Sequence, residues 1–309
     1  MWTEGVGMEK TDLFDMHDLL DSTHTMGPRL MVVVNPYDAA TLESVFRAMS
    51  GGAIDPVLVG ERELITKAAD DIKVPLEDMK IVHCEDNSTA VAASLLCEGK
   101  AHFIMKGMVG TGAFFHVLFE PRFKIRTQRV LSHVGMFEIP ATKRIFLMSD
   151  AAINIQPNFS RKIHIISNAV DAAIKLGFPQ IRVAMLAAVE KLNLPAMPAT
   201  LDAFLMKRFA RTGYFGHCEI DGPFAFDNAI DPRSAGTKGI GGNVAGNANI
   251  LIAPNIETGN VIWKSITCIH GGDAAGVVLG GTCPIVVPSR ADTFKTKLDS
   301  IYLSRMLLA

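Results

Sequence analysis

One local pattern recurs along most of the sequence: a short apolar run rich in β-branched residues, a small polar or glycine turn, and then a stretch with helical periodicity. This order is typical of β-α-β units. The apolar runs are continuous instead of alternating, which predicts strands covered on both faces. The predicted strands lie at residues 30–34, 57–59, 81–83, 103–105, 130–134, 145–148, 183–186, 250–253, 277–279 and 285–287. The pattern therefore indicates an α/β fold.

Between these strands, apolar residues recur every three or four positions, as in helices that cover a sheet. Such helices are expected at residues 40–49 and 160–176, and a last one at about residues 291–307. The chain has 309 residues, which exceeds the roughly 250–300 at which single cores stop growing. We therefore expect two lobes, with a site in the cleft between them.

Charge and cysteine content narrow the class of protein. Thirty Lys and Arg against 32 Asp and Glu give a net charge of −2, so no overall field attracts nucleic acid or an anionic membrane. Any phosphate binding must therefore be local. The five cysteines form no CxxC pair and are odd in number, which argues against zinc and against a disulfide framework. A reducing compartment fits best.

Neither the amino-terminal segment nor the longest apolar run suits a secreted or membrane protein. The first fifteen residues carry acids instead of a basic region and an apolar stretch, so they do not form a secretory signal. The longest apolar run, residues 274–288, is interrupted by Gly, Thr and Pro and does not suit a membrane-spanning helix. We expect a cytoplasmic protein without a membrane partner.

Several common active-site motifs are missing. Lys106 and Gly107 lack the GxxxxGK(S/T) frame of the P-loop, and the glycine-rich segment 239–244 has Val244 where GxGxxG requires its third glycine. The nine histidines show no paired metal-ligand spacing and no GxSxG accompanies them. ATPase, Rossmann dehydrogenase, metal-site and triad-hydrolase interpretations all lose support.

The most promising local feature is Ser289-Arg290, delivered by an apolar strand to the expected start of the last helix. A helix N-terminus offers unpaired N–H groups and a positive dipole end, and Arg290 adds a guanidinium matched to phosphate oxygens. This predicts an anion site. An alternative is purely structural, because Ser289 with Asp292 three residues later also suits a helix N-cap.

A second cluster runs from Lys106 and Gly107 to Thr111, directly after a predicted strand and before an apolar stretch containing His116. In open α/β sheets, ligands gather beyond the carboxyl ends of strands, and small residues allow the backbone to approach them. The segment is therefore a candidate substrate site. A surface turn with a solvated lysine is the alternative.

Weaker candidates follow along the chain. Arg129, close to Arg126 and followed by Ser132, offers guanidinium groups for the phosphates of a ligand, although a charge run is more often a solvated face. In the turn-like segment 254–260, Gly259 and Asn260 would keep a loop close to a ligand, unless the segment is an ordinary turn and cap.

Cys283 lies in an apolar run, which favours a core position over a site-lining one.

Six segments in order carry a resemblance to a known family: KGMVGTGAF, RTQRVLSHVGMFEIP, SDAAINIQP, EIDGPFAFDNAID, NANILIAPNIETGN and GGTCPIVVPSRAD. Together they resemble the phosphate acetyl/butyryltransferase family, most closely its butyryltransferase branch. The resemblance implies two α/β/α lobes with a cleft, a fold shared with isocitrate and isopropylmalate dehydrogenases, and a homodimer. The first lobe would contain residues 1–145 and 286–309, and the second residues 146–285.

The resemblance also implies a reaction in which acyl-CoA and phosphate give acyl phosphate and coenzyme A, by direct attack in a ternary complex without metal or permanently bound cofactor. Arg290 would neutralise the phosphate and Ser289 would hydrogen-bond the developing oxyanion or thiolate. Two positions depart from the family: His116 stands where an arginine is expected, and Thr296 where a catalytic aspartate is expected. Asp292 is the nearest substitute, so the base that activates the thiol stays open.

Two other functions remain alternatives at this stage. A metal- and NAD-dependent hydroxyacid dehydrogenase shares the implied fold, but it would need a carboxylate cluster that the sequence does not show. A degenerate acyl-CoA-binding sensor would account for His116 and Thr296. Acyl-chain length is not fixed, because one methylene contributes only about 1–3 kcal/mol to discrimination.

Overall fold

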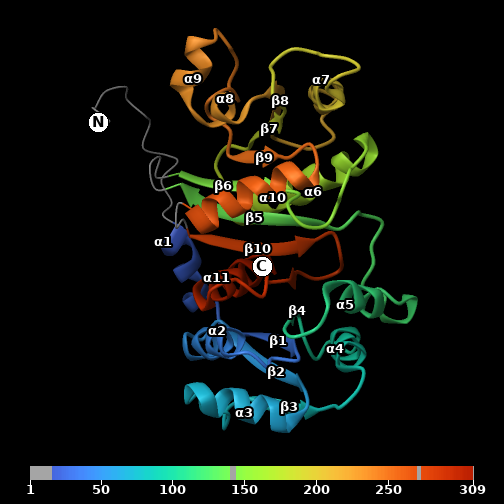
Figure 1. The fold of residues 1–309 in the computed structure, drawn as a ribbon, viewed down its shortest axis with the longest axis vertical. Helices are drawn as coiled ribbons and strands as arrows, with labels where there is room; N and C mark the ends of the chain where they lie inside the picture. Colours follow the sequence, from blue (N-terminus) through green and yellow to red (C-terminus); the bar gives the residue numbers. More distant parts are fainter. Residues whose placement is uncertain (1–15, 140–143, 270–272, 309) are drawn as a thin grey trace.

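The computed structural model describes residues 16–139, 144–269 and 273–308. The acidic amino-terminal segment that argues against a secretory signal lies outside these residues. The described strands join one sheet in the order β3-β2-β1-β4-β11-β10-β5-β6-β9-β7-β8, which follows the long axis of Figure 1. Their bounds are β1 (Arg29–Val34), β2 (Ile54–Gly60), β3 (Lys80–His83), β4 (Phe103–Lys106), β5 (Ser132–Ile139), β6 (Arg144–Ser149), β7 (Arg182–Leu186), β8 (Glu219–Phe224), β9 (Ile250–Ile252), β10 (Ala274–Leu279) and β11 (Ile285–Val286).

The sheet is mixed. Strands β3, β2, β1, β4 and β11 run parallel to one another, and so do β6, β9, β7 and β8. Strands β10 and β5 lie between these two groups and make antiparallel pairs with each other, with β11 and with β6. The last strand along the chain therefore lies beside β4, far from it in sequence.

The helices are α1 (Met16–Asp21), α2 (Ala39–Ser50), α3 (Arg62–Ile72), α4 (Ser88–Cys97), α5 (Thr111–Leu118), α6 (Phe159–Lys175), α7 (Pro198–Ala210), α8 (Phe226–Ile230), α9 (Pro232–Thr237), α10 (Ile256–Lys264) and α11 (Phe294–Met306). Short 3-10 turns at Ser22–Thr25 and Pro121–Phe123 and a π turn at Ser265–Ile269 complete the described elements. Among the described helices, none combines the length and apolar character needed to cross a membrane.

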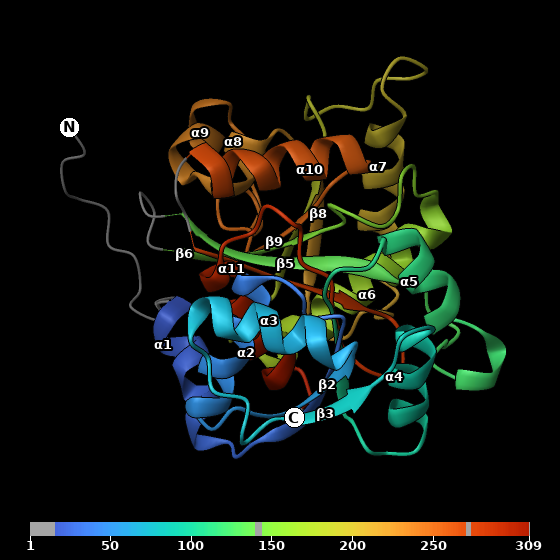
Figure 2. The same ribbon diagram turned by 60° about the horizontal axis from the view of Figure 1, so that its bottom comes forward.

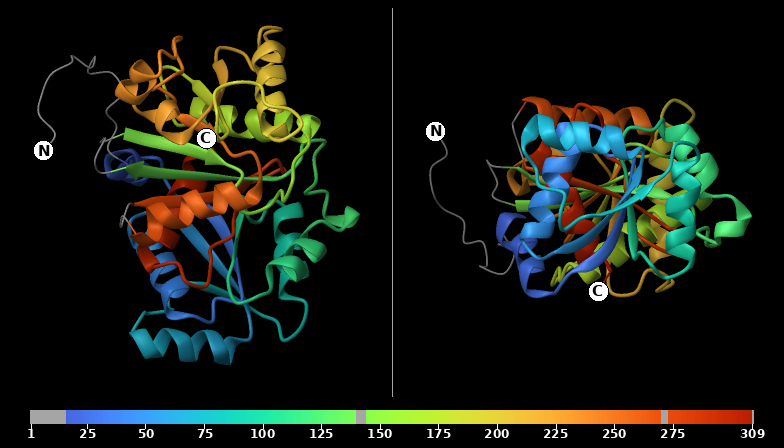
Figure 3. Two further views of the ribbon diagram at one scale, coloured as in Figure 1. Left: turned by 45° about the horizontal axis from the view of Figure 1, so that its top comes forward. Right: turned by 90° about the horizontal axis from the view of Figure 1, so that it is seen from below.

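Both faces of the first parallel group are covered, as the continuous apolar strands predict. Met31 and Val33 of β1 belong to the core that includes α2 and α3, whereas Val32 and Val34 belong to the core that includes α4 and α5. Figures 2 and 3 show these helix pairs on opposite sides of the strands. Alternate β1 side chains therefore enter two different cores, which explains why the whole strand is apolar.

The predicted strands all occur, with one omission and with displaced boundaries at three strands: β2 and β10 begin three residues earlier than predicted. Strand β5 begins at Ser132 and continues to Ile139, beyond the predicted residues 130–134. Strand β8 was not predicted, because Gly222 and Pro223 interrupt its apolar pattern. It forms the edge of the sheet and its pairing with β7 is irregular, and edges and bulges are the places where a strand tolerates proline.

Helix α11 brings a buried carboxyl group into the core. Asp299 is 8% exposed, and burial raises its pKa to about 7, with Lys295 opposing this rise and Asp273 adding to it. The charges of His17 and Asp21 act on it more weakly. Lys295 also forms an ion pair with Asp273, so it is shared between two carboxylates.

This carboxyl group predicts a pH-dependent stability. The pKa of Asp299 rises from an ordinary 3.8 in the unfolded chain to about 7 in the fold, so the folded state binds the extra proton between these values. Stability should therefore fall as pH rises from 4 to 7 and then level off. In Asp299→Asn this part of the pH dependence should disappear, as measured by melting temperature across that range, whereas the exposed control Asp70→Asn should retain it. An unchanged profile in Asp299→Asn would contradict the assignment.

Candidate functional site

The candidate site begins where β4 and β11 end. These strands are parallel neighbours, with Ile104 opposite Ile285 and Met105 opposite Val286. Lys106 is the last residue of β4, and Ser289 follows β11 on the same edge of the sheet. Because parallel strands end at one edge, the two candidate segments, which are far apart in sequence, lie together.

The loop that carries Ser289 differs from the prediction. Helix α11 begins at Phe294, and its N-cap is Thr293, whose hydroxyl accepts a hydrogen bond from the Thr296 amide at 3.2 Å. Ser289 is therefore not an N-cap, and the argument for an anion at the helix terminus does not apply at Ser289. The physical reason is that Thr293 is also a good capping residue and stands closer to the helical stretch.

Asp292 organises this loop instead. Its Oδ2 accepts a hydrogen bond from the Ser289 amide at 2.8 Å, and its Oδ1 lies 3.7 Å from the ammonium nitrogen of Lys264 in α10. The Ala291 amide donates to the Ser289 hydroxyl over 3.4 Å. Ser289 and Arg290 are exposed. The hydroxyl hydrogen and the guanidinium group therefore face solvent, available to a ligand.

Lys106 is buried, not solvated. It is 4% exposed, and its ammonium group donates to the carbonyl oxygens of Gly107 and Val109, at 3.2 Å each. Burial lowers its pKa, and the charges of Arg290 and then Lys297 lower it further. The parallel pairing of β4 with β11 places the Lys106 turn and the Arg290 loop at one edge of the sheet, so the charge of Arg290 reaches Lys106. Lys106 also holds the turn that follows β4.

Gly107 is required by the close approach of β1. A Cβ at this position would lie 2.4 Å from the Asn35 carbonyl oxygen and 2.5 Å from that of Val34. No other residue fits without moving the end of β1. The glycine therefore keeps the ends of β1 and β4 in contact beneath the site.

Sequence reasoning missed the ion pair under this edge. Lys297 of α11 is 3% exposed and donates to Asp38 at 2.8 Å and to the Thr41 hydroxyl at 3.0 Å. Burial alone would raise the pKa of Asp38, but hydrogen bonds from Lys297 and Thr41 outweigh it, and the pKa is lowered. Asp38 is also the N-cap of α2. A capping signal before the predicted helix was detectable in the sequence, but the partner, 259 positions away, was not.

The sum of these charges is positive. Lys106, Arg290, Lys297 and Lys264 carry four positive charges, and Asp38 and Asp292 supply two negative charges. An excess of positive charge at the carboxyl edge of parallel strands suits an anion such as phosphate. This local field exists although the chain as a whole is slightly acidic.

Helix α5 carries two further candidates. Thr111 is its first residue, close in sequence to Lys106, and His116 lies in its second half. Both residues are exposed. No contact joins either of them to Ser289 among the interactions of the described residues. Their proposed roles stay predictions.

Three candidates lie toward the opposite end of β11. Ser132 begins β5 opposite Leu279, and its hydroxyl accepts a hydrogen bond from Asn168 at 2.9 Å. Arg129 forms an ion pair with Asp171 of α6. Cys283 precedes β11, and burial raises its pKa to about 12. The structure therefore does not group these residues with Ser289.

Gly259 and Asn260 lie within α10, so they do not form a loop beside a ligand, and the alternative of an ordinary turn and cap is confirmed. The helix begins earlier because Asn255 caps it, accepting a hydrogen bond from the Thr258 amide at 3.0 Å. A Cβ on Gly259 would lie 2.3 Å from the Asp150 carbonyl oxygen, and Asn260 donates to the Ala151 carbonyl at 3.3 Å. These residues fix α10 against the end of β6.

A buried histidine lies under α10. His133 of β5 packs edge-on against Trp263, and its Nδ1 has no hydrogen-bond partner. Burial lowers its pKa, while the charges of Asp150 and Asp292 act in the opposite direction. Within the described ranges, no group of three or more His, Cys, Asp or Glu side chains could hold a metal ion.

Comparison with known proteins identifies the family. The sequence matches the family described as "Phosphate acetyl/butaryl transferase" over residues 83–304. The chain belongs to this family. Among its relatives is a phosphate butyryltransferase of Clostridium beijerinckii, 35% identical over 94% of this chain and 97% of that protein. A phosphate butyryltransferase of Clostridium acetobutylicum is 37% identical over 87% and 90%, and a phosphate acetyltransferase of Rhizobium meliloti is 35% identical over 94% and 92%.

Solved structures support the same placement. A branched-chain phosphotransacylase from Enterococcus faecalis V583 superposes with a TM-score of 0.80 at 26% identity, covering 90% of this chain and 99% of that one. A phosphotransacetylase from Streptococcus pyogenes, at 18% identity and a TM-score of 0.79, covers 96% and 99% and shows that the fold is shared. The chain is thus a member of an acyltransferase family with a mixed α/β fold.

Proposed function

We propose that this protein transfers a short acyl group between coenzyme A and phosphate, with butyryl-CoA or a similar thioester as substrate. The observation that carries the proposal is the parallel pairing of β4 with β11, which brings the Lys106 turn and the loop of Ser289 and Arg290 to one edge of the sheet. The family relatives support the reaction class. They give no support to a dehydrogenase or to a sensor.

Each group at this edge has a distinct part in the proposed reaction. Arg290, exposed and always charged, binds phosphate oxygens directly. The Ser289 hydroxyl donates to the oxygen or sulfur on which charge develops. Lys106 acts mainly through its field, because its side chain is buried and donates to two carbonyl oxygens of its own turn. Holding acyl-CoA and phosphate in one ternary complex contributes proximity.

The wider organisation is part of the same proposal. Residues 1–145 with 286–309 form one α/β/α lobe and residues 146–285 the other, as in isocitrate and isopropylmalate dehydrogenases, with the substrates between them. The protein acts in the cytoplasm as a homodimer, without a permanently bound cofactor. The first lobe contains the parallel group β1–β4 with β11. The second lobe contains the parallel group β6–β9.

Phosphate dependence tests the reaction. Purified protein with butyryl-CoA should release coenzyme A only when phosphate, or its analogue arsenate, is present. A thiol reagent measures the release, and acyl phosphate is trapped as a hydroxamate. A panel from acetyl-CoA to valeryl-CoA and isobutyryl-CoA then defines the acyl preference. The proposal is wrong if coenzyme A is released equally with and without phosphate, or if no thioester releases coenzyme A.

Arg290→Ala should lower kcat/KM by at least about two orders of magnitude, because the lost charge stabilises the transition state. Arg290→Lys should recover part of the loss, since it restores charge without the planar fork. Arg208→Ala on α7, where Arg208 lies over Phe204, is the matched control and should behave as the unmodified protein. Near-normal turnover by Arg290→Ala would reject the role of Arg290.

Asp292 offers a sharper test, because loop positioning and base catalysis predict different results. Asp292→Asn keeps an oxygen for the Ser289 amide but cannot accept the thiol proton. Both Asp292 oxygens already have partners, so we expect Asp292→Asn to stay within about tenfold of normal kcat/KM and Asp292→Ala to fall well below it. If both variants lose about a hundredfold or more, and the loss changes with pH, Asp292 is the base instead.

A further inference from the structure

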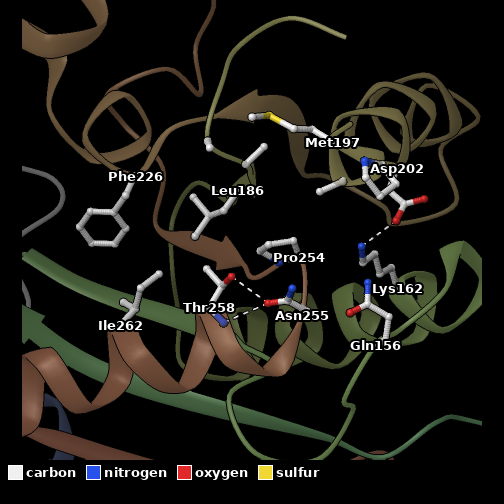
Figure 4. A pocket seen from close by; sticks show the side chains of 14 residues that line it. Gln156, Lys162, Leu186, Met197, Asp202, Phe226, Pro254, Asn255, Thr258 and Ile262 are labelled. Atoms are coloured by element: carbon white, nitrogen blue, oxygen red, sulfur yellow. Dashed lines mark hydrogen bonds and ion pairs between the residues drawn. The ribbon is translucent and has the colours of Figure 1, made fainter. Parts of the chain in front are cut away.

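A cavity of about 370 Å³ lies beside α10, away from Ser289. Its walls come from α6, the end of β7, the first turn of α7, Phe226 of α8 and the flank of α10 (Figure 4). This volume is within the range of roughly 300–1,000 Å³ that is usual for small-molecule sites. Nothing in the proposed acyl transfer uses it.

Helix α10 separates this cavity from the Ser289 loop. Thr258 and Ile262, four residues apart, line the cavity on one flank of the helix. Lys264, two residues after Ile262, forms the ion pair with Asp292. Since an α-helix turns by about 100° per residue, Ile262 and Lys264 point in nearly opposite directions. The cavity therefore lies on the flank of α10 that faces away from the Lys264–Asp292 ion pair.

The cavity is amphipathic. Figure 4 shows Leu186, Phe226 and Ile262 at one end and the Lys162–Asp202 ion pair at the other, beside Asn255. The apolar end suits an aliphatic chain. The ion pair is 2.7 Å long, and the Lys162 side chain is 3% exposed, so the polar end is built into the fold and does not belong to the open surface.

Hydrogen-bond donors predominate at the polar end. The Oδ1 of Asn255 is occupied by the amide and hydroxyl of Thr258, which leaves its Nδ2 as a donor. Lys162 uses one of its N–H groups on Asp202, so others remain. Helix α7 begins at the cavity with Pro198, which has no N–H, and the Thr200 amide donates to the Met197 carbonyl oxygen, so the Ala199 amide is the further donor at this end.

We infer that the cavity is a second binding site, for a linear aliphatic carboxylate of about six carbons. Its carboxylate accepts hydrogen bonds from Lys162, Asn255 and the Ala199 amide, and its chain packs against Leu186, Phe226 and Ile262. The charge of Asp202 is already matched by Lys162, and the start of α7 contributes a positive dipole end. Occupancy acts on the Ser289 loop through α10, because the helix carries Ile262 on one side and Lys264 on the other.

Binding is tested with hexanoate by isothermal titration calorimetry on the full chain. The unmodified protein should show saturable binding, and Ala188→Phe, which fills the mouth of the cavity from an exposed position, should weaken it at least tenfold. Lys162→Met should weaken the binding of hexanoate at least tenfold but leave the binding of hexanol unchanged. The matched control is Lys207→Met, which removes another Lys–Asp pair of α7, with Asp221, outside the cavity lining. Absence of saturable binding, or equal binding by Ala188→Phe, overturns the site.

Circular dichroism will test whether Lys162→Met is folded. If Lys162→Met is unfolded, the comparison of Ala188→Phe with Lys207→Met decides whether the cavity binds hexanoate.

The effect on the Ser289 loop rests on the proposed acyl transfer and has its own measurement. Saturating hexanoate should change the phosphate-dependent kcat/KM at least twofold in the unmodified protein and in Lys207→Met, but not in Ala188→Phe. An equal effect in Ala188→Phe, or none in any variant, rejects the coupling. If no acyl transfer occurs with any thioester, the calorimetry still decides whether the cavity binds hexanoate, so the two proposals fail separately.

Discussion

The parallel pairing of β11 with β4 is the contact on which the rest of the site depends. It joins Ile104 to Ile285 and Met105 to Val286, residues that are far apart in the sequence. Without it, Ser289 and Lys106 would have no common edge. A pairing of such long sequence separation costs loop-closure entropy, which the buried core on both faces of β4 and β11 offsets. The site is thus a product of the completed sheet, not of a local motif.

The buried charges at this edge are paired with each other, whereas the positive charges nearest the predicted anion have no carboxylate partner. Lys297 is buried with Asp38, and both are satisfied by hydrogen bonds, so this pair contributes a fixed local geometry at the ends of β1 and α11. Lys106 is held by backbone carbonyls without a carboxylate of its own. Arg290 stays exposed. The unmatched positive charge therefore belongs to the two residues nearest the predicted anion, where a phosphate would stabilise both.

The sequence predicted what depends on local order and missed what depends on distant partners. Continuous apolar runs located every strand except β8, whose proline is tolerated only because β8 is an edge strand with irregular pairing. The segments around Lys106 and Ser289 were found, but their contact was not derivable from spacing. The prediction that Ser289 caps the last helix was wrong, because Thr293 is the N-cap of α11. Lys297 resembled a surface residue, since periodicity cannot reveal that α11 is covered on nearly every side.

Helix α10 is suited to transmit a displacement between two sites, because it is held tightly on one face only. A Cβ on Gly259 would overlap the Asp150 carbonyl, and a Cβ on Gly135 would lie 2.3 Å from the Trp263 ring, so the helix is packed against β6 and β5 without spare room. It has little freedom to tilt toward the sheet. In the proposed coupling, a ligand beside Ile262 displaces the helix from the flank that lines the cavity. That movement carries Lys264 with it, and Lys264 is paired to the residue that holds the Ser289 amide.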